Sequence, residues 1–165
     1  MSSTEVDQSQ RPEVLLQTVD PDAPAAVATV ARYFAELNER LPGGFDAMGP
    51  GYGSGAAELR PPNGAFVVGL VDGQPAACGG VRTIGDGIGE IKRMWIDPQR
   101  RGLGLGSRLL AHLEALSAGL NHRIVRLDTN DNLTEALRLY RRRGYREIEP
   151  YNDNPYARCW FEKQL

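Results

Sequence analysis

Cysteine and histidine are scarce in this chain of 165 residues, which contains two of each. Cys78 and Cys159 have no CxxC partner and no nearby pair of histidines, so the sequence predicts no zinc site or other metal site. Two isolated cysteines are typical of a reducing compartment. Cys78 lies in an apolar stretch of small residues and is interpreted as a packed side chain rather than a nucleophile.

Long hydrophobic runs and a large net charge are also missing. The longest apolar run, Ala65 to Val71, is too short to cross a bilayer, and Met1 to Arg11 is polar and lacks the apolar core of a signal peptide. We therefore expect a cytoplasmic protein in which residues 1–11 are a disordered tail and residues 12–165 form one domain. The formal net charge of -2 argues against general binding to nucleic acid.

Glycine is plentiful, and its placement is the most informative feature of the sequence. The run Arg101 to Gly106 alternates glycine with leucine, follows the strand-like segment Glu90 to Pro98 and opens the leucine-rich segment Ser107 to Leu120. A strand that leads through a glycine turn into a helix leaves backbone N–H groups pointing at one spot, where the helix dipole adds positive charge. The pattern predicts a pyrophosphate site flanked by Arg100, Arg101 and Arg108.

Two other nucleotide-binding patterns fit this loop less well. A P-loop requires Lys and then Ser or Thr after its second glycine, whereas Gly106 is followed by Ser107 and Arg108. The dinucleotide fingerprint G-x-G-x-x-G is one residue longer in its second half than the spacing found here. Asp128 stands where a ribose-binding acid could lie, but residues 129–165 are too few for the remaining strands and helices of a dinucleotide-binding fold. A nicotinamide-dependent reductase is therefore the weakest hypothesis.

The hydrophobic periodicity predicts an α+β domain with a mixed, mostly antiparallel sheet of about seven strands and helices on both faces. The glycine-rich segment Leu41 to Gly64, which contains Phe45, Tyr52 and Ser54, is expected to form a lid or a short second helix. Asn132 and Glu135 are expected to form a capping box at the last helix. The expected strands are Glu13–Val19, Gly64–Val71, Gln74–Thr83, Glu90–Ile96, Arg123–Asp128, Tyr145–Ile148 and Ala157–Lys163, and the expected helices are Pro24–Leu41, Ser107–Leu120 and Asn132–Gly144.

The glycine loop also fits a third pattern, R/Q-x-x-G-x-G/A, through Arg101, Gly104 and Gly106. With the strand Glu90–Ile96 before it and the segment Glu135–Tyr145 after it, the chain resembles the GNAT superfamily of acyl-CoA-dependent N-acyltransferases. The closing run Tyr151–Lys163 looks like the ending of a bacterial branch whose acceptors are mostly unassigned. The resemblance implies that acetyl-CoA is the acetyl donor and that the sheet splays open between the strands that begin at Glu90 and Arg123.

The resemblance also implies where the donor binds. Its pyrophosphate would lie on the backbone N–H groups from Arg101 to Ser107, and its pantetheine arm would run beside Met94, Trp95 and Ile96 like an added strand. Asn132 is predicted mainly as a helix cap, and a contact with the cofactor is the alternative interpretation. The expected cofactor-binding residues are Met94, Trp95, Ile96, Arg101, Gly102, Leu103, Gly104, Leu105, Gly106, Ser107 and Asn132.

Tyr140 and Glu90 are the expected catalytic residues. Tyr140 aligns with the tyrosine that family members place near the thioester sulfur, where a phenol, being less acidic than a thiol, can protonate the departing thiolate. Glu90 stands where several members carry a glutamate that deprotonates the amine through water. A packed helix tyrosine and a plain strand-end carboxylate are the competing interpretations, and His122 or bulk water the competing bases.

The acceptor is expected to contact Arg82, Arg93, Tyr33 and Tyr151. A guanidinium could hold the carboxylate of an amino-acid-like acceptor through two parallel hydrogen bonds. Strand alternation puts Lys92 and Arg93 on opposite faces, so only one of them points inward unless a bulge intervenes.

The leading hypothesis is an enzyme that moves an acetyl group from acetyl-CoA to a primary amine of a small molecule, amino acid-like or polyamine. No Cys or Ser nucleophile motif is present, so the hypothesis has the amine attack directly in a ternary complex. The alternatives are a non-catalytic acyl-CoA-binding sensor or interaction module and an acetyltransferase of protein N-termini or lysines. The sequence leaves open the acceptor, the preferred acyl chain and the oligomeric state, with a homodimer as one alternative.

Overall fold

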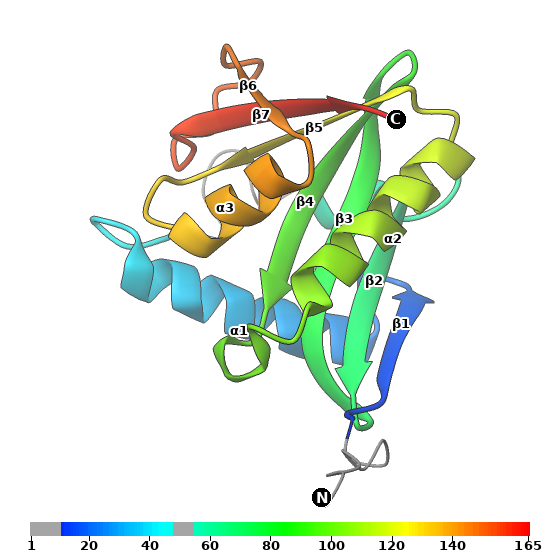
Figure 1. Ribbon diagram of the computed structural model, residues 1–165, viewed down its shortest axis with the longest axis vertical. Helices are drawn as coiled ribbons and strands as arrows, with labels where there is room; N and C mark the ends of the chain where they lie inside the picture. The colour runs from blue at the N-terminus through cyan, green and yellow to red at the C-terminus, as the bar shows by residue number, and fades with distance from the viewer. Residues whose placement is uncertain (1–10, 48–54) are drawn as a thin grey trace, which may run out of the picture.

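A computed structural model describes residues 11–47 and 55–165, so the tail expected at residues 1–11 lies outside the described residues except for Arg11. The strands form one seven-stranded sheet in the order β1-β2-β3-β4-β5-β7-β6 (Figure 1). The strands are β1 (Val14–Val19), β2 (Gly64–Val71), β3 (Gln74–Gly85), β4 (Ile88–Ile96), β5 (Ile124–Thr129), β6 (Arg146–Ile148) and β7 (Cys159–Gln164). The helices are α1 (Pro24–Arg40), α2 (Leu105–Gly119) and α3 (Thr134–Arg142), with short 3-10 turns η2 (Gly55–Glu58) and η3 (Pro98–Arg100).

The sheet is mixed and mostly antiparallel, as the sequence predicts. Strands β1 to β4 run antiparallel in chain order, β4 and β5 are parallel, and β7 pairs antiparallel with both β5 and β6. The β2–β3 hairpin closes at Asp72 (φ 49) and Gly73 (φ 79). Two consecutive residues with positive φ give a turn whose twist matches that of the flanking strands. The fold class and the hairpin are therefore confirmed.

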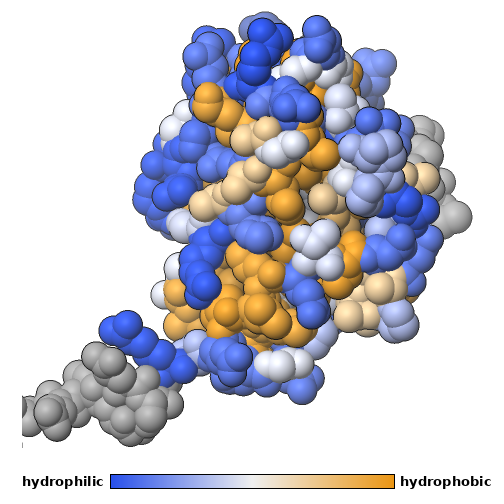
Figure 2. All heavy atoms as spheres, turned by 90° about the vertical axis from the view of Figure 1, so that its right-hand side faces the viewer, coloured by the Kyte–Doolittle hydropathy of each residue, from blue (hydrophilic) through white to orange (hydrophobic). Residues whose placement is uncertain are grey.

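Helices cover both faces of the sheet. Alternate residues of each strand point to opposite sides, so one strand packs against a helix on each face. Phe66 and Val68 of β2 belong to one apolar cluster with Ala26 and Val30 of α1. Val67 and Val71 of the same strand belong to the main core with residues of α2, including Leu109 and Leu113. Figure 1 shows α1 and α2 on the two sides of the central strands. On the face turned to the viewer in Figure 2, where α2 and β1 lie, apolar side chains extend to the surface.

The ends of α1 follow the sequence closely, but the start of α3 does not. Pro24 occupies the first turn of α1, where its missing N–H costs nothing, and the helix ends just before Pro42. The predicted capping box at Asn132 and Glu135 is wrong: α3 begins at Thr134, and its cap residue, Leu133, makes no side-chain cap hydrogen bond. Both polar side chains are used instead in contacts with Arg40 of α1.

The glycine-rich segment from Leu41 to Gly64 is only partly described. It contains the short turn η2, which agrees with the expectation of a short helix, while Tyr52 and Ser54 lie outside the described residues. Just after η2, Leu59 is fully buried and packs in the cluster that holds α1 against the sheet.

The sheet splays open between β4 and β5, as the family resemblance implies. The two strands pair only from Ile88–Glu90 to Ile124–Arg126. Further along β4, the register shifts between Cys78, which pairs with Trp95, and Gly80, which pairs with Lys92, so β4 carries an extra residue there. Arg93 has a φ of 56 within this bulge. The bulge lets consecutive side chains of β4 reach the same opening.

Candidate active site

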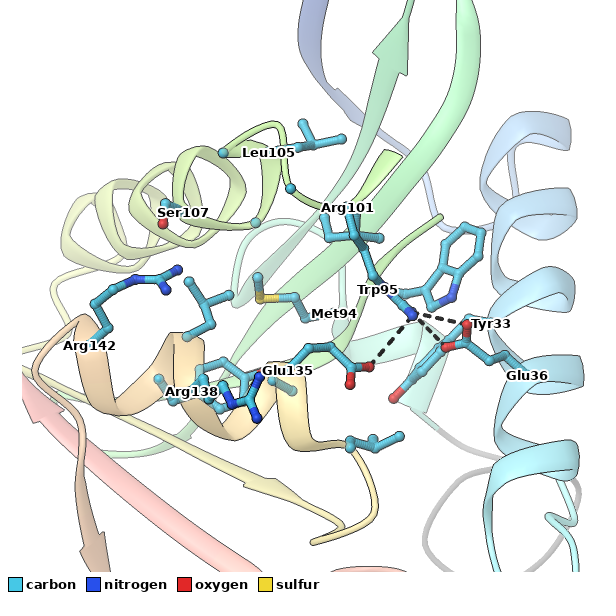
Figure 3. A pocket seen from close by; sticks show the side chains of 18 residues that line it. Tyr33, Glu36, Met94, Trp95, Arg101, Leu105, Ser107, Glu135, Arg138 and Arg142 are labelled. Atoms are coloured by element: carbon cyan, nitrogen blue, oxygen red, sulfur yellow. Dashed lines mark hydrogen bonds and ion pairs between the residues drawn. The ribbon is translucent and has the colours of Figure 1, made fainter. Parts of the chain in front are cut away.

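A pocket of about 440 Å³ lies at the splay, between β4, the start of α2, α3 and α1 (Figure 3). Of the expected cofactor residues, it is lined by Met94, Trp95, Ile96, Arg101, Gly102, Gly104, Leu105, Gly106 and Ser107. Its other lining residues are Tyr33, Glu36, Leu133, Glu135, Ala136, Arg138, Leu139, Tyr140 and Arg142. We call this space the larger pocket.

The N-terminus of α2 forms one end of the larger pocket. Gly104 is its N-cap residue, with a φ of 74, and Gly102 has a φ of 84. The first backbone hydrogen bond of the helix runs from the N–H of Arg108 to the carbonyl of Gly104. The N–H groups of Leu105, Gly106 and Ser107 therefore have no partner within the helix and are available to an anion.

Gly106 has a packing role as well. A Cβ added there would lie 3.2 Å from Leu139 Cδ2. The glycine therefore allows the first turn of α2 to come close to α3, and both helices line the larger pocket.

A charged network crosses one side of the larger pocket. The Arg101 guanidinium donates to both oxygens of Glu36 in α1, at 3.0 and 2.8 Å, and lies 3.6 Å from Glu135 in α3. Glu135 in turn pairs with Arg40 of α1. The hydrogen bond from Arg40 lowers the pKa of Glu135 from 4.5 to about 2. The network joins the glycine loop to both helices. Of its members, the sequence analysis expected only Arg101 at the cofactor site.

The wall supplied by β4 fits an extended ligand with polar groups. Beyond Glu90 this strand has no pairing with β5, so its backbone groups at Met94 to Ile96 face the splay. Trp95 is almost fully buried, and its indole Nε1 has no hydrogen-bond partner among the described residues. Together with the N–H groups of α2, this wall suits the pantetheine and pyrophosphate of acetyl-CoA.

Leu103 and Asn132, also expected at the cofactor, do not line the larger pocket. The Leu103 side chain is 56% exposed. Asn132 joins α3 to α1, because its side chain donates to the Arg40 carbonyl at 3.3 Å.

A second, smaller pocket of about 50 Å³ adjoins the larger one. The two share Tyr33, Met94, Leu133, Ala136 and Tyr140. The smaller pocket is further lined by Leu37, Leu41, Ile91, Lys92, Arg93, Asp128, Thr129, Asn130, Asn154, Tyr156 and Ala157. Both Lys92 and Arg93 reach it, as the bulge in β4 allows.

Tyr140 lies where the two pockets meet. Its side chain is largely buried, and its ring contacts those of Tyr145 and Phe161, at centroid distances of 5.8 and 6.2 Å. The predicted helical face is therefore confirmed, and the same residue borders both pockets. Packing and a catalytic contact are compatible for this side chain.

Glu90 is fully buried behind the smaller pocket. Arg82 Nε donates to Glu90 Oε1 at 2.8 Å, and the Tyr151 hydroxyl donates to Oε2 at 2.7 Å. Burial, followed by the negative charge of Glu90, raises the pKa of Tyr151, so this hydroxyl stays protonated. Glu90 is not among the described residues that line the two pockets.

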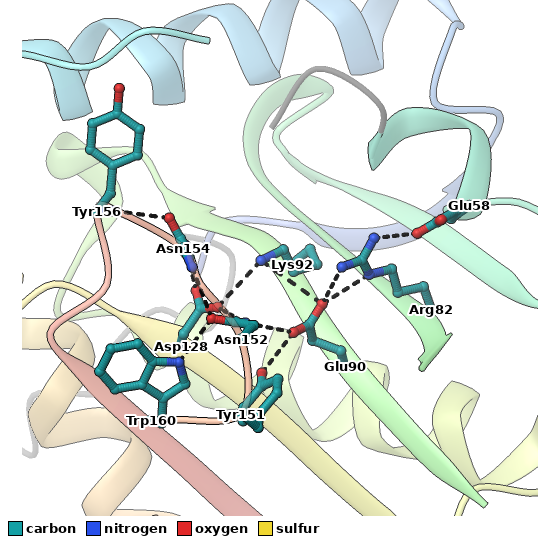
Figure 4. Close-up of polar contacts among 10 residues, drawn as sticks. All are labelled: Glu58, Arg82, Glu90, Lys92, Asp128, Tyr151, Asn152, Asn154, Tyr156 and Trp160. Atoms are coloured by element: carbon teal, nitrogen blue, oxygen red, sulfur yellow. Dashed lines mark hydrogen bonds and ion pairs between the residues drawn. The ribbon is translucent and has the colours of Figure 1, made fainter. Parts of the chain in front are cut away.

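Asp128, on the far side of the splay, is held by the loop between β6 and β7 (Figure 4). Asn152 Nδ2 donates to Asp128 Oδ2 at 2.6 Å, and Asn154 Nδ2 donates to Oδ1 at 3.1 Å. Lys92 Nζ lies 3.6 Å from Oδ2. Asn152 also accepts a hydrogen bond from Trp160 Nε1 at 2.9 Å. Sequence analysis missed both asparagines, although their place in the polar run Tyr151–Tyr156 marked a loop.

Only two of the four residues expected at the acceptor line the smaller pocket. Arg93 and Tyr33 line the smaller pocket. Arg82 pairs with Glu90 and Glu58, and Tyr151 donates to Glu90, so both stand behind the pocket rather than in it. Their direct contact with an acceptor stays a prediction.

His122, named as a competing base, and Cys78, interpreted as a packed side chain, are both buried and line neither pocket. His122 is buried between Ser117 Oγ (2.6 Å) and Thr83 Oγ1 (2.8 Å), and burial lowers its pKa. Cys78 is fully buried, and burial raises the pKa of its thiol to about 12. A thiol held in that state is a poor nucleophile.

A protein-family model matches most of the chain. Residues 30–145 match the model of the acetyltransferase (GNAT) family. The chain belongs to this family. The resemblance of the glycine loop and of the Tyr140 segment is thereby confirmed, and so is the fold class.

Relatives of this GNAT chain include an uncharacterised N-acetyltransferase and an IAA acetyltransferase. It is 37% identical over 97 residues to an uncharacterised N-acetyltransferase of Schizosaccharomyces pombe, which covers 58% of this chain and 60% of that protein. It is 34% identical over 113 residues to an IAA acetyltransferase of Azospirillum brasilense, covering 65% of this chain and 72% of the relative.

Solved structures share the GNAT fold over nearly the whole chain. A GNAT-family acetyltransferase from Staphylococcus aureus superposes with a TM-score of 0.79 at 16% identity, covering 93% of this chain and 99% of that one. A GNAT acetyltransferase from Elizabethkingia anophelis with acetyl-CoA bound gives a TM-score of 0.63 at 14% identity, covering 92% and 98%. At these identities the likeness concerns the fold.

Within residues 11–47 and 55–165, no group of three or more His, Cys, Asp and Glu side chains is placed to hold a metal ion. No helix in the same part of the chain has the length and apolar character needed to cross a membrane.

Proposed function

We propose that this protein transfers an acetyl group from acetyl-CoA to the primary amine of a small molecule. The observation that carries the proposal is the junction of two pockets at Tyr140: the larger pocket is lined by the first turn of α2, and Tyr140 lines both that pocket and the smaller one. A thioester in the first space and an amine in the second would meet beside Tyr140.

Tyr140 is proposed as the general acid of the transfer. When the amine lone pair forms the new C–N bond, the C–S bond breaks and the thiolate leaves with a negative charge. A phenol at the junction can donate its proton to that sulfur, which lowers the barrier to departure. The same reaction was expected from the sequence.

Direct transfer in a ternary complex is supported by the placement of the thiols. Cys78 Sγ lies 3.3 Å from the Arg93 carbonyl and is buried in the core, and among the described lining residues of both pockets there is no cysteine. A covalent intermediate on a thiol therefore has no site at the junction.

The small volume of the second pocket favours a slender acceptor. About 50 Å³ holds the end of a primary amine and a few atoms beyond it. Leu37, Leu41 and Leu133 line its apolar side, whereas Lys92, Arg93 and Asp128 give its other side charges of both signs. Both an amino acid and a polyamine carry a primary amine of suitable width.

A thiol-release assay tests the proposal. The purified protein is given acetyl-CoA and, one at a time, amino acids, polyamines and short peptides. We expect release of CoA that depends on one class of amine, and a much lower rate with acetyl-pantetheine, which lacks the pyrophosphate. Tight binding of acetyl-CoA by calorimetry without release for any amine would support the sensor alternative instead.

A further inference from the structure

Two buried carboxylates face each other across the splay, and they differ in what surrounds them. Glu90 on β4 has one oxygen bonded to Arg82 and the other to the Tyr151 hydroxyl. Neither oxygen borders the smaller pocket, since Glu90 is not among its described lining residues. A proton could pass from the pocket to Glu90 only through another group.

Asp128 on β5 does border the smaller pocket, together with Tyr140 and Met94. Its side chain is only 4% exposed, so a ligand in that pocket is the main approach to its carboxylate. A carboxylate can accept about four hydrogen bonds. Oδ1 accepts one, from Asn154, and Oδ2 accepts one, from Asn152, with Lys92 further away at 3.6 Å. Oδ1 therefore retains a lone pair for a donor.

We infer that Asp128 is the group that takes the proton from the acceptor amine. The inference rests on the proposed function, because it needs an amine in the smaller pocket. The ammonium gives one N–H proton to Asp128, which becomes a neutral acid, and the freed lone pair attacks the thioester carbon. The C–S bond breaks, and sulfur takes the Tyr140 proton. The nitrogen gives its second proton to the Tyr140 oxygen, and Asp128 releases its proton to solvent.

Charged groups face Asp128 from several elements. Lys92 faces it from β4, with Nζ 3.6 Å from Oδ2. Glu90 stands behind the pocket and is paired with Arg82. Arg93 and Tyr140 line the same pocket, and the Tyr151 hydroxyl stands behind it, bonded to Glu90. The two asparagines from the β6–β7 loop hold Asp128 without adding charge.

The central test replaces Asp128 by Asn and measures kcat/KM from about pH 5.5 to about pH 10 with the best acceptor found. Asp128→Asn keeps the shape of the side chain but removes the base. We expect a loss of about 10²- to 10⁴-fold at neutral pH that shrinks as rising pH deprotonates the amine in solution. Glu90→Gln should instead reduce the rate by one factor at every pH. Glu147→Gln, an exposed carboxylate away from both pockets, controls for the loss of one charge.

A second variant covers the case in which Asp128→Asn does not fold. Asn154→Asp keeps the oxygen that accepts from the Tyr156 N–H, but it places a second carboxylate beside Asp128. Like charges disfavour ionisation, so the acid limb of the profile should move to higher pH. An unmoved limb, or a folded Asp128→Asn variant with wild-type rates, would overturn the inference.

The inference and the proposed function fail in different ways. If wild-type protein releases no thiol with any amine, the proposed function is wrong. If wild-type protein turns over and the loss that shrinks with rising pH appears in Glu90→Gln rather than in Asp128→Asn, the function stands and Glu90 is the base.

Discussion

The larger and the smaller pocket adjoin each other but are built from different parts of the chain. The larger one depends on backbone: the N–H groups of the first turn of α2 and the unpaired edge of β4, both within the continuous stretch Met94–Ser107. The smaller one depends on side chains from five separate segments: Leu37 of α1, Lys92 of β4, Asp128 of β5, Tyr140 of α3 and Asn154 of the β6–β7 loop.

This difference indicates how each pocket can vary. A site made of backbone N–H groups keeps its chemistry when most side chains around it change, provided that its glycines remain. A site made of side chains changes its ligand with each substitution. The larger pocket therefore suits a ligand common to a family, whereas the smaller one suits an acceptor particular to this protein.

The largest effect is expected from Gly104→Val, which attacks the backbone-built pocket. Gly104 has a φ of 74, a conformation that is strained for a residue with a Cβ and most of all for a β-branched one. Relief of the strain would turn the first N–H groups of α2 away from the anion. Calorimetry should detect no binding of acetyl-CoA, while a thermal melt confirms that the variant is folded.

Gly119→Ala provides the matched control for that experiment. Gly119 lies in the same helix, it is not among the glycines with positive φ, and a Cβ added there meets no atom within 4 Å. This variant should bind acetyl-CoA as the wild type does. If a folded Gly104→Val protein also did so, the pyrophosphate would have to lie elsewhere.

The same division explains what the sequence could predict. The strand, the glycines and the helix of the larger pocket are neighbours in the chain, so their pattern is visible without a structure. Glu36, Arg40 and Glu135 join it only because α1 and α3 pack together, a contact between residues far apart in sequence. The predicted capping box is absent as well: Glu135 pairs with Arg40, and the side chain of Asn132 donates to the Arg40 carbonyl. Beside the smaller pocket, Asn152 and Asn154 hold Asp128, but the sequence shows them only as loop residues because the contact forms when the β6–β7 loop folds onto β5.

The second prediction concerns Tyr140, the residue that both pockets share. Tyr140→Phe keeps the ring and its contacts with Tyr145 and Phe161 but removes the hydroxyl. We expect kcat to fall by about 10²- to 10⁴-fold, the usual contribution of one general acid. Affinity for acetyl-CoA and the melting temperature should change little. Wild-type turnover by a folded variant, with chemistry as the slow step, would make Tyr140 a packing residue.

A third, smaller effect should be confined to the acceptor side. Tyr151→Phe removes the hydrogen bond of 2.7 Å to Glu90, which leaves Oε2 with only a 3.5 Å contact from Asn152. Loss of one hydrogen bond to a charged group costs about 1.5–3 kcal/mol. Because the loop that holds Asp128 loosens, we expect KM for the amine to rise about tenfold. The Kd for acetyl-CoA should stay unchanged.

Tyr145→Phe separates this effect from a general loss of stability. The Tyr145 hydroxyl donates to Glu114 Oε2 at 2.8 Å, so it is a buried Tyr–Glu pair of the same kind, but it lies outside both pockets. It should lower the melting temperature to a similar extent and leave both KM values alone. Equal changes in KM from the two variants would mean that the acceptor pocket responds to stability rather than to the Tyr151 contact.

The smallest effect should come from the side-chain network at the edge of the larger pocket. The pKa of Glu135 is about 2 in the folded protein, below its ordinary value of 4.5, because Arg40 donates to it. The ionised carboxylate therefore stabilises the fold above about pH 4.5, and this stabilisation is lost as the pH falls through about 2.

The side chain is 40% exposed, so solvent screening limits the contribution to less than about 1 kcal/mol, or about 2–4 °C in Tm. Glu135→Gln should melt lower than the wild type by that amount at pH 7 and by only a small part of it at pH 2, with added salt narrowing the gap, while Glu147→Gln shows no such dependence. A gap of undiminished size at pH 2 would trace the stabilisation to packing of the Glu135 stem instead of its charge. Because the N–H groups of α2 are not part of the network, affinity for acetyl-CoA at pH 7 should change far less than it does in Gly104→Val.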